Sequence, residues 1–267
     1  MKVDVFDLNG KATGKIDLPA VFSEQVREDL IRRAVSAMQS KRRQPYGTDP
    51  YAGLRSSAHY HGYRRHRYTM MNREMARMPR IHGKTTPQLT WRARLVPQAV
   101  KGREAHPPKA EKVWSLKIND KERRKAIRSA IAATALKELV ARRGHRFALD
   151  ALPIVVDDEL QSLKKTKDVV EFFKKVGLEK ELKRISERKV RAGVGKTRGR
   201  RYKRKIGPLI VIAEDKGISN AAKNLLGVNI VRAQNLSAEH LAPGAVPGRL
   251  AIFTKSAIEW LKNKHGE

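Results

Sequence analysis

Cysteine is absent from the chain. Its absence excludes disulfide bonds and thiolate metal sites, and it is compatible with a reducing compartment without requiring one. Acidic residues are also scarce, since 27 Asp and Glu face 58 Lys and Arg among 267 residues, a formal net charge of +31. Such a chain repels itself unless a polyanion neutralises it, and extended nucleic acid does this more fully than a small ligand. We therefore expect a permanent nucleic-acid partner.

Long hydrophobic runs are missing as well. No stretch approaches the roughly 18 apolar residues that a membrane-spanning helix requires, and the N-terminal MKVDVFDLNG alternates like a strand without a signal-peptide pattern. These features predict a cytoplasmic protein with no membrane partner. Hydrophobic residues nevertheless make up 40% of the chain, which is enough for one core of ordinary domain size.

Residues 41–112 differ in composition from the rest of the chain. They hold 17 Lys and Arg against four Asp and Glu, but only six Val, Ile or Leu, too few to bury a core. Pro and Gly interrupt any regular pattern, yet five of the six Tyr and five of the eight His lie here. Aromatic rings and guanidinium groups stack on exposed bases. We interpret the segment as an extended, basic binding loop that folds on RNA.

Residues 1–40 and 113–267 show regular patterns that predict a globular domain. Apolar runs predict strands at 3–8, 152–158, 208–215, 228–235 and 249–255. Helical periodicity predicts helices at 23–42, 119–145, 166–177, 178–189, 219–226, 237–243 and 256–264, with Ser23 and Asn119 or Asp120 as N-caps and Gly144 as a stop. Continuous β-branched strands that alternate with helices indicate an α/β fold, a three-layer domain with a mostly parallel sheet. The basic loop is inserted after the first helix.

A second basic segment, RAGVGKTRGRRYKRK at 191–205, has two interpretations. GVGKT ends like a phosphate-binding loop, but Val190 stands at the first glycine position, and a helix precedes the loop while a strand follows it, the reverse of the required order. The alternative is a strip of Lys and Arg that contacts phosphates, with Gly193, Gly195 and Gly199 letting the backbone approach RNA. We favour the strip over both the phosphate-binding loop and a merely solvated charge run.

Three histidines in the loop could suggest a metal site. His59, His61 and His66 are closely spaced, but no carboxylate or Cys accompanies them, and the neighbouring arginines repel a cation. We therefore expect base stacking or phosphate contact from these rings and no metal-binding residue.

Two further patterns have a structural interpretation. Met71, Met75 and Met78 have the spacing of a small helix that packs one face. Asp157 and Asp158 end a predicted strand, where α/β enzymes place catalytic groups. No partnered His, Lys or nucleophile is evident nearby in the sequence, so we expect the two acids to cap a helix or begin a loop, and we expect no catalytic residue.

Seven collinear stretches resemble a known family. They include QPYGTDPYAGLRSSA, MARMPR, HPPKAEK and GKTRGRRYKRK, and they lie at 18–35, 44–58, 75–80, 106–112, 119–135, 141–145 and 195–205, across nearly the whole chain. They are similar to the fourth protein of the large ribosomal subunit, in its archaeal and eukaryotic form. The resemblance implies a structural, non-enzymatic constituent of that subunit, which binds rRNA, supports early assembly and helps to line the nascent-peptide exit tunnel with its loop tip.

The resemblance also implies partners. These are large-subunit rRNA, other large-subunit proteins including the twenty-second beside the tunnel, and transiently the nascent peptide. We expect no cofactor, and Mg²⁺ only as part of the bound rRNA.

Predicted contact residues come from the two basic segments. The predicted RNA-binding residues are Arg42, Arg43, Tyr46, Tyr51, Arg55, His59, Tyr60, Arg64, Arg65, Arg67, Trp91, Arg92, Arg94, Lys101, Arg103, Lys109, Lys196, Arg198, Arg200, Arg201, Tyr202, Lys203, Arg204 and Lys205. The match of MARMPR implies that Arg77 and Arg80 lie near the tunnel tip, with His82, Lys84 and Thr85 as neighbours. Where relatives commonly show a glycine-rich SxGxGR run, this chain has the bulkier HYHGYRRHRYTMMN at 59–72.

Two other functions compete with this interpretation. An RNA-modifying enzyme with an α/β catalytic domain requires a glycine turn directly after a strand, and the predicted strands end in DDEL, AEDKG, AQNLS and TKSA, of which only DKG contains a glycine. A regulator that binds messenger RNA would use the same basic surfaces, so the sequence leaves this alternative open.

Overall fold

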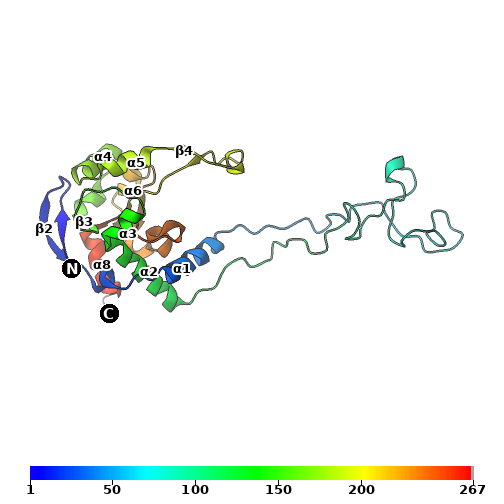
Figure 1. The fold of residues 1–267 in the computed structure, drawn as a ribbon, viewed down its shortest axis with the longest axis horizontal. Helices are drawn as coiled ribbons and strands as arrows, with labels where there is room; N and C mark the ends of the chain where they lie inside the picture. Colours follow the sequence, from blue (N-terminus) through cyan, green and yellow to red (C-terminus); the bar gives the residue numbers. More distant parts are fainter. Residues whose placement is uncertain (266–267) are drawn as a thin grey trace. The chain divides into compact units, whose positions relative to one another are not determined.

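The computed structural model describes residues 1–265. The chain forms two compact units, one made of Met1–Arg42 with Ser115–Glu267 and the other of Arg43–Trp114. We call the first the α/β unit and the second the insert. Figure 1 shows the helices and strands of the α/β unit and the irregular chain of the insert.

Six strands of the α/β unit form one sheet, in the order β2-β1-β3-β8-β6-β7. Their bounds are β1 Lys2–Phe6, β2 Ala12–Asp17, β3 Ile154–Val156, β6 Leu209–Ile212, β7 Asn229–Arg232 and β8 Ala251–Thr254. Only β1 and β2 pair in antiparallel fashion, and every other neighbouring pair is parallel. This arrangement confirms the predicted mostly parallel sheet. Strand β2 was not predicted, because it lies at the edge with nearly all its residues exposed and lacks an apolar pattern.

Helices cover both faces of the sheet (Figure 1). Their bounds are α1 Glu28–Lys41, α2 Asp120–Ala135, α3 Lys137–Arg142, α4 Thr166–Lys175, α5 Glu179–Ser186, α6 Ile218–Ala222, α7 Ala238–Leu241 and α8 Lys255–His265. Successive residues of β6 alternate between the two cores. Leu209 and Val211 pack with α1, α2 and α8, whereas Ile210 and Ile212 pack with α4 and α6. This alternation confirms the predicted three-layer α/β domain.

The start of the first helix was predicted wrongly. Ser23 is the last residue of a 3₁₀ turn, Ala20–Ser23, and α1 begins only at Glu28. The turn buries Val21 and Phe22 in the core, after which the chain runs extended to Arg27. There the Ser129 hydroxyl accepts a 2.6 Å hydrogen bond from the Arg27 amide. Tertiary contact with α2 thus replaces the expected Ser23 cap.

The single long helix predicted at 119–145 is two helices. Leu136 takes an extended conformation between α2 and α3. Ala130 and Ile131 of α2 pack into one core, whereas Val140 of α3 packs into the other. The break is therefore what allows the chain to pass from one layer to the other. No helix in residues 1–265 is both long and apolar enough to cross a membrane.

The described residues of the insert contain no α-helix and no strand. They contain one 3₁₀ turn, Pro87–Leu89, and isolated backbone bridges that join His59 to Arg80 and Arg80 to Ala93. The helix predicted over Met71–Met78 is wrong, because this stretch forms turns and bends. Met70 is fully buried instead.

The first and last parts of the insert, near residues 48–53 and 103–108, pack closely on each other; we call them its two legs. The Thr48 amide donates a 3.1 Å hydrogen bond to the Pro108 carbonyl. Gly53 has a φ of +77°, and a Cβ at this position would lie 2.5 Å from the Arg103 Cα. Only glycine fits there, both because of its backbone conformation and because the opposite leg leaves no room.

We expect Phe253→Ala to destabilise the α/β unit. Phe253 is fully buried, and its ring meets that of Phe22 edge-on at a centroid distance of 5.4 Å. Removing it should lower the free energy of unfolding by roughly 3–5 kcal/mol, measured by denaturant titration with circular dichroism. The control, Val246→Ala, truncates an exposed side chain and should change the free energy of unfolding by less than about 0.5 kcal/mol. Equal effects of the two variants would contradict the assigned core.

Candidate nucleic-acid interface

A basic hairpin projects from the helices and sheet of the α/β unit (Figure 1). Its strands are β4, Lys189–Val190, and β5, Tyr202–Lys203, which pair in antiparallel fashion. The Arg191 amide extends the pairing with a 2.8 Å hydrogen bond to the Arg201 carbonyl. GVGKT therefore lies at the tip of a two-stranded ribbon, followed by β5 and not by a helix, and this geometry excludes the phosphate-binding loop.

Two glycines give the hairpin tip its turns. Gly193 and Gly199 have φ values of +81° and +77°, and no heavy atom outside their immediate neighbours would lie within 4 Å of an added Cβ. The structure thus requires glycine here for backbone conformation, and it leaves open space beside both residues.

Most predicted contact residues of the hairpin are exposed. They are Lys196, Arg198, Arg200, Arg201, Tyr202, Lys203 and Arg204, whereas Lys205 is half-buried. Lys205 forms an ion pair with Glu187, and the Arg201 guanidinium lies 5.7 Å from the centre of the Tyr202 ring. The ribbon thus presents a row of cations with one aromatic ring, which is suited to phosphates and an occasional base.

A buried carboxylate supports the base of the hairpin. Glu181 of α5 is fully buried, and its oxygens accept hydrogen bonds from the Arg184 Nη2 at 2.7 Å, the His145 Nδ1 at 2.7 Å and the Arg146 amide at 2.9 Å. The same Arg184 Nη2 donates to the Ile206 carbonyl at 2.6 Å. The network therefore ties the chain after β5 to α5.

The charge state of this network follows from its surroundings. Burial by itself would raise the pKa of Glu181, but hydrogen bonds from Arg184, His145 and the Arg146 amide outweigh it and lower the pKa to about 2. Burial lowers the pKa of His145 despite the opposing effect of Glu181. At neutral pH the network thus pairs an ionised Glu181 with Arg184 and a neutral imidazole.

A basic cavity of about 540 Å³ opens at the base of the hairpin. Seven Lys and Arg residues line it: Arg142, Arg143, Arg184, Lys189, Lys203, Arg204 and Lys205. Burial and the nearby Arg184 lower the pKa of Arg143 to about 10, so this guanidinium stays charged at neutral pH. Among residues 1–265, no Asp or Glu lines the cavity, which makes it a candidate phosphate site. The sequence did not predict Arg142, Arg143 and Arg184 as contact residues. The basic run ARRGH at 141–145 could have indicated the first two.

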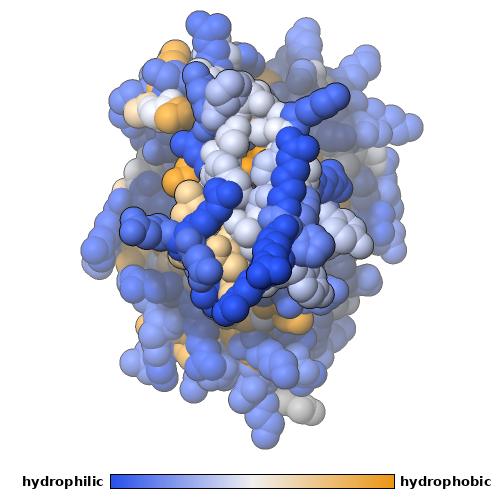
Figure 2. Space-filling model, turned by 90° about the vertical axis from the view of Figure 1, so that its right-hand side faces the viewer, coloured by the Kyte–Doolittle hydropathy of each residue, from blue (hydrophilic) through white to orange (hydrophobic). Residues whose placement is uncertain are grey.

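The insert also presents its basic residues to solvent. The exposed predicted residues of the insert are Arg43, Tyr46, Tyr51, Arg55, His59, Tyr60, Arg64, Arg65, Arg67, Arg92, Lys101, Arg103 and Lys109, together with Arg77 and Lys84 of the predicted tip. Arg42, the last residue of the α/β unit before the insert, is exposed as well. Trp91, Arg94, Arg80, His82 and Thr85 are half-buried. Arg42 and Arg55 form ion pairs with Glu239 and Asp49. The visible face of the molecule is dominated by hydrophilic side chains (Figure 2).

Two of the half-buried arginines hold the insert together. The Arg80 guanidinium donates to the Trp91 carbonyl at 2.8 Å and to the Ala76 carbonyl at 3.1 Å. The Arg94 guanidinium donates to the Val100 carbonyl. These guanidinium groups spend N–H donors on hydrogen bonds within the insert. Exposed arginines such as Arg77 are therefore better placed to contact a nucleic acid.

Aromatic side chains form two clusters in the insert. In the first, Tyr46 stacks on Trp114 at a centroid distance of 5.6 Å, and the Arg43 guanidinium lies 3.8 Å from the centre of a Trp114 ring. Trp114 was missed because the predicted loop ended at residue 112. In the second, Tyr68 stacks on His82 at 4.6 Å, with Trp91 beside both.

Comparison with known proteins identifies the family. Residues 16–264 match the ribosomal protein L4/L1 family. The chain belongs to this family. It is 50% identical to the large ribosomal subunit protein uL4 of Methanopyrus kandleri over 269 residues, covering 100% of both chains. It is 51% identical to the uL4 of Archaeoglobus fulgidus, covering 98% of each chain, and 46% identical to that of Haloarcula marismortui, covering 97% of this chain and 98% of the relative.

Membership of the L4/L1 family confirms several predictions. The chain is a ribosomal protein of the large subunit and not an enzyme. Its place is the ribosome, which in archaea lies in the cytoplasm. The RNA-modifying enzyme considered from the sequence is thereby excluded.

The two adjacent acids of this L4/L1 family protein have structural contacts. The Asp158 carboxylate accepts hydrogen bonds from the Ser256 amide at 3.1 Å and the Gln161 side chain at 2.9 Å. Asp157 accepts a 3.3 Å hydrogen bond from the Thr13 hydroxyl. Asp158 thus fixes the start of α8 to the turn after β3, in keeping with the expected non-catalytic role.

We expect Glu181→Gln to lower the free energy of unfolding by roughly 3–5 kcal/mol at pH 7, because it leaves a buried network without its negative charge. The wild-type pKa of about 2 lies below the ordinary value of 4.5, so Glu181 contributes its full stabilisation above pH 4.5 and loses it as the pH falls towards 2. Denaturant titrations at pH 7 and pH 3 should therefore show a smaller difference between variant and wild type at pH 3.

The matched control is Glu179→Gln on the same helix. Glu179 is exposed and forms an ion pair with Lys183, at 2.8 Å, so its neutralisation should change stability little at either pH. A difference between wild type and Glu181→Gln that is as large at pH 3 as at pH 7 would refute the ionised state of Glu181.

Proposed function

We propose that this protein is a structural rRNA-binding component of the large ribosomal subunit, and that it supports early subunit assembly. The main support for this proposal is the arrangement of exposed cations on the insert and on the hairpin. Internal hydrogen bonds hold each of these two segments in place. Each Lys or Arg that meets a phosphate releases a condensed counterion, so that binding is strong and steeply dependent on salt.

The hairpin and its basic cavity serve as one anchor in this proposal. Exposed Arg198, Arg200 and Arg201 contact the RNA backbone, and the cavity beneath them accepts a further phosphate group. The Glu181 network supports the hairpin from inside the α/β unit, so its cations are presented in a defined place. Such preorganisation reduces the entropy that binding must offset.

The insert is the second anchor. Its buried hydrophobic residues are only Ala58, Met70 and Ile81 among those described, which is little apolar material for its length. Hydrogen bonds between its legs and aromatic stacks order it in part, and surrounding RNA supplies the remaining stabilisation. The insert then acts as an electrostatic strut within the rRNA.

We further propose that the insert tip helps to line the nascent-peptide exit tunnel. Arg77 and Lys84 are exposed there, whereas the Arg80 guanidinium is bound to backbone carbonyls. Partners in this proposal are large-subunit rRNA, the twenty-second protein of the subunit and, transiently, the nascent peptide. The function needs no cofactor, and Mg²⁺ enters with the rRNA.

We expect reversal of Arg198, Arg200 and Arg201 to Glu to weaken binding to large-subunit rRNA. The slope of the logarithm of affinity against the logarithm of salt concentration should fall by roughly 0.9 for each phosphate that the variant no longer neutralises. Thermal stability should stay unchanged, because all three side chains are exposed. Filter binding over a range of salt concentrations measures the slope.

A control with the same change of charge is Lys165, Lys174 and Lys180 to Glu, at exposed positions before and on α4 and α5. If both triple variants weaken binding equally, net charge alone governs binding and the hairpin is not an anchor. Binding of the wild-type chain to free messenger RNA in competition with rRNA would favour the regulatory alternative.

We expect deletion of residues 59–82 to leave the α/β unit folded but to impair assembly of the large subunit or alter its tunnel. Sucrose-gradient sedimentation of cell lysates at low and high salt, with the protein followed by mass spectrometry, measures its incorporation. The wild-type chain should stay with the large subunit after a stringent salt wash. Normal subunits with unchanged tunnel density in the deletion strain would show that the strut is dispensable.

A further inference from the structure

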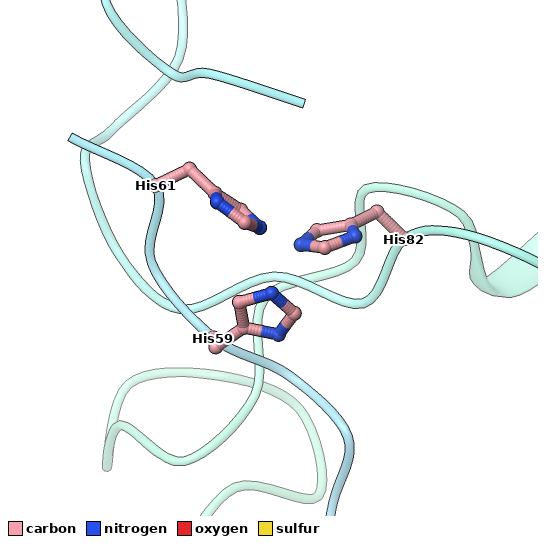
Figure 3. Close-up of side chains that lie close together, drawn as sticks. All are labelled: His59, His61 and His82. Atoms are coloured by element: carbon pink, nitrogen blue, oxygen red, sulfur yellow. The ribbon is translucent and has the colours of Figure 1, made fainter. Parts of the chain in front are cut away.

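Three histidines converge in the insert. His59 and His61 lie on one segment and His82 on another, and their rings point towards one another (Figure 3). The ring centroid of His59 lies 4.2 Å from those of both His61 and His82, and the last two lie 4.5 Å apart. One nitrogen of each ring lies within 4.8 Å of the other two. The cluster differs from the one considered in the sequence, because the fold brings in His82 and not His66.

The ring nitrogens of this cluster are available for a ligand. The Nε2 atoms of His61 and His82 are buried and have no hydrogen-bond partner. A buried polar atom without a partner is costly, so each such nitrogen requires an explanation.

His59 already makes the hydrogen bond through its second ring nitrogen that metal-binding histidines commonly make. Its Nδ1 lies 3.0 Å from the Ser57 carbonyl oxygen, which can only accept, so Nδ1 carries the proton. In the neutral ring Nε2 then has a free lone pair. Metal-ligating histidines commonly donate their other N–H to a backbone carbonyl in this way, because the contact fixes both tautomer and ring orientation.

The walls of the cluster are aromatic. The Tyr68 ring stacks on His82 with an interplanar angle of 13°, and Trp91 lies 6.2 Å from His82. These rings shield the cluster on the side of His82. Arg64, Arg65 and Arg67 are exposed, and the Arg67 guanidinium lies 4.9 Å from the centre of the Tyr68 ring. Exposed charges are screened by solvent and salt, which weakens the repulsion expected from the sequence.

We propose that His59, His61 and His82 bind one Zn²⁺ ion, which ties residues 59–61 to residue 82. Imidazole nitrogens suit zinc, and three protein ligands leave the fourth tetrahedral position for water. Tetrahedral coordination needs nitrogen atoms about 3.3 Å apart. Small rotations of the rings, which move their nitrogen atoms by about an ångström, would complete the site. The ion closes the intervening loop and stabilises a part of the insert that buries little apolar surface.

The test is zinc binding to the untagged full-length chain without RNA. Competition with a chromogenic chelator should show one Zn²⁺ bound per chain, and Co²⁺ in its place should give the visible absorption of a tetrahedral nitrogen-rich site. We expect His82→Ala and His61→Ala each to weaken Zn²⁺ binding by at least roughly tenfold. Two variants are needed in case one perturbs the insert.

The control is His66→Ala. His66 is exposed in the same loop and packs against Tyr63 at a centroid distance of 5.8 Å, outside the cluster. It should bind Zn²⁺ like the wild type. Absence of stoichiometric Zn²⁺ binding by the wild-type chain, or equally weakened binding in all three variants, would overturn the site. Because the assay contains no RNA, this outcome leaves the proposed rRNA binding untouched.

Discussion

Electrostatic repulsion among 58 Lys and Arg side chains is the constraint on which the rest of this structure depends. The α/β unit can bury a core because much of the excess charge lies on the insert and on the exposed hairpin, and not on the buried strands and helix faces. Both carry their cations on turns, short ribbons and extended chain, where side chains reach solvent. A compact domain and a polyanion-binding surface thus coexist in one chain because they occupy different segments.

Internal polar contacts take the place of a core in the basic segments. In the insert, the Arg80 guanidinium bonds to backbone carbonyls, and Tyr46 and Arg43 stack on Trp114. At the hairpin, the buried Glu181 holds Arg184, which in turn holds the chain after β5. Some cations therefore shape the surface, while others remain free to meet phosphates. Charge density in the sequence does not separate these two roles, because both use the same residue types.

The parts of the fold that were predicted and those that were not have different physical origins. Strands β3, β6 and β8 were evident because they are buried on both faces and read as continuous apolar runs. The edge strand β2 was missed because its pairing with β1 leaves nearly every side chain exposed. The break at Leu136 was missed because local helix propensity continues through it, whereas α2 and α3 pack into opposite cores. The helix predicted over Met71–Met78 was wrong because helical spacing of the methionines alone does not provide a surface against which a helix can pack.

The sequence by itself determined the α/β class, the basic insert and the family, because apolar periodicity, composition and long collinear motifs are properties of the chain order. Only the tertiary structure decided which residues act together. It joined Arg142, Arg143 and Arg184 to the hairpin in one basic cavity, and it placed His82 beside His59 and His61. Such groupings depend on where distant segments meet, and that is set by core packing and backbone pairing rather than by the spacing of residues along the chain.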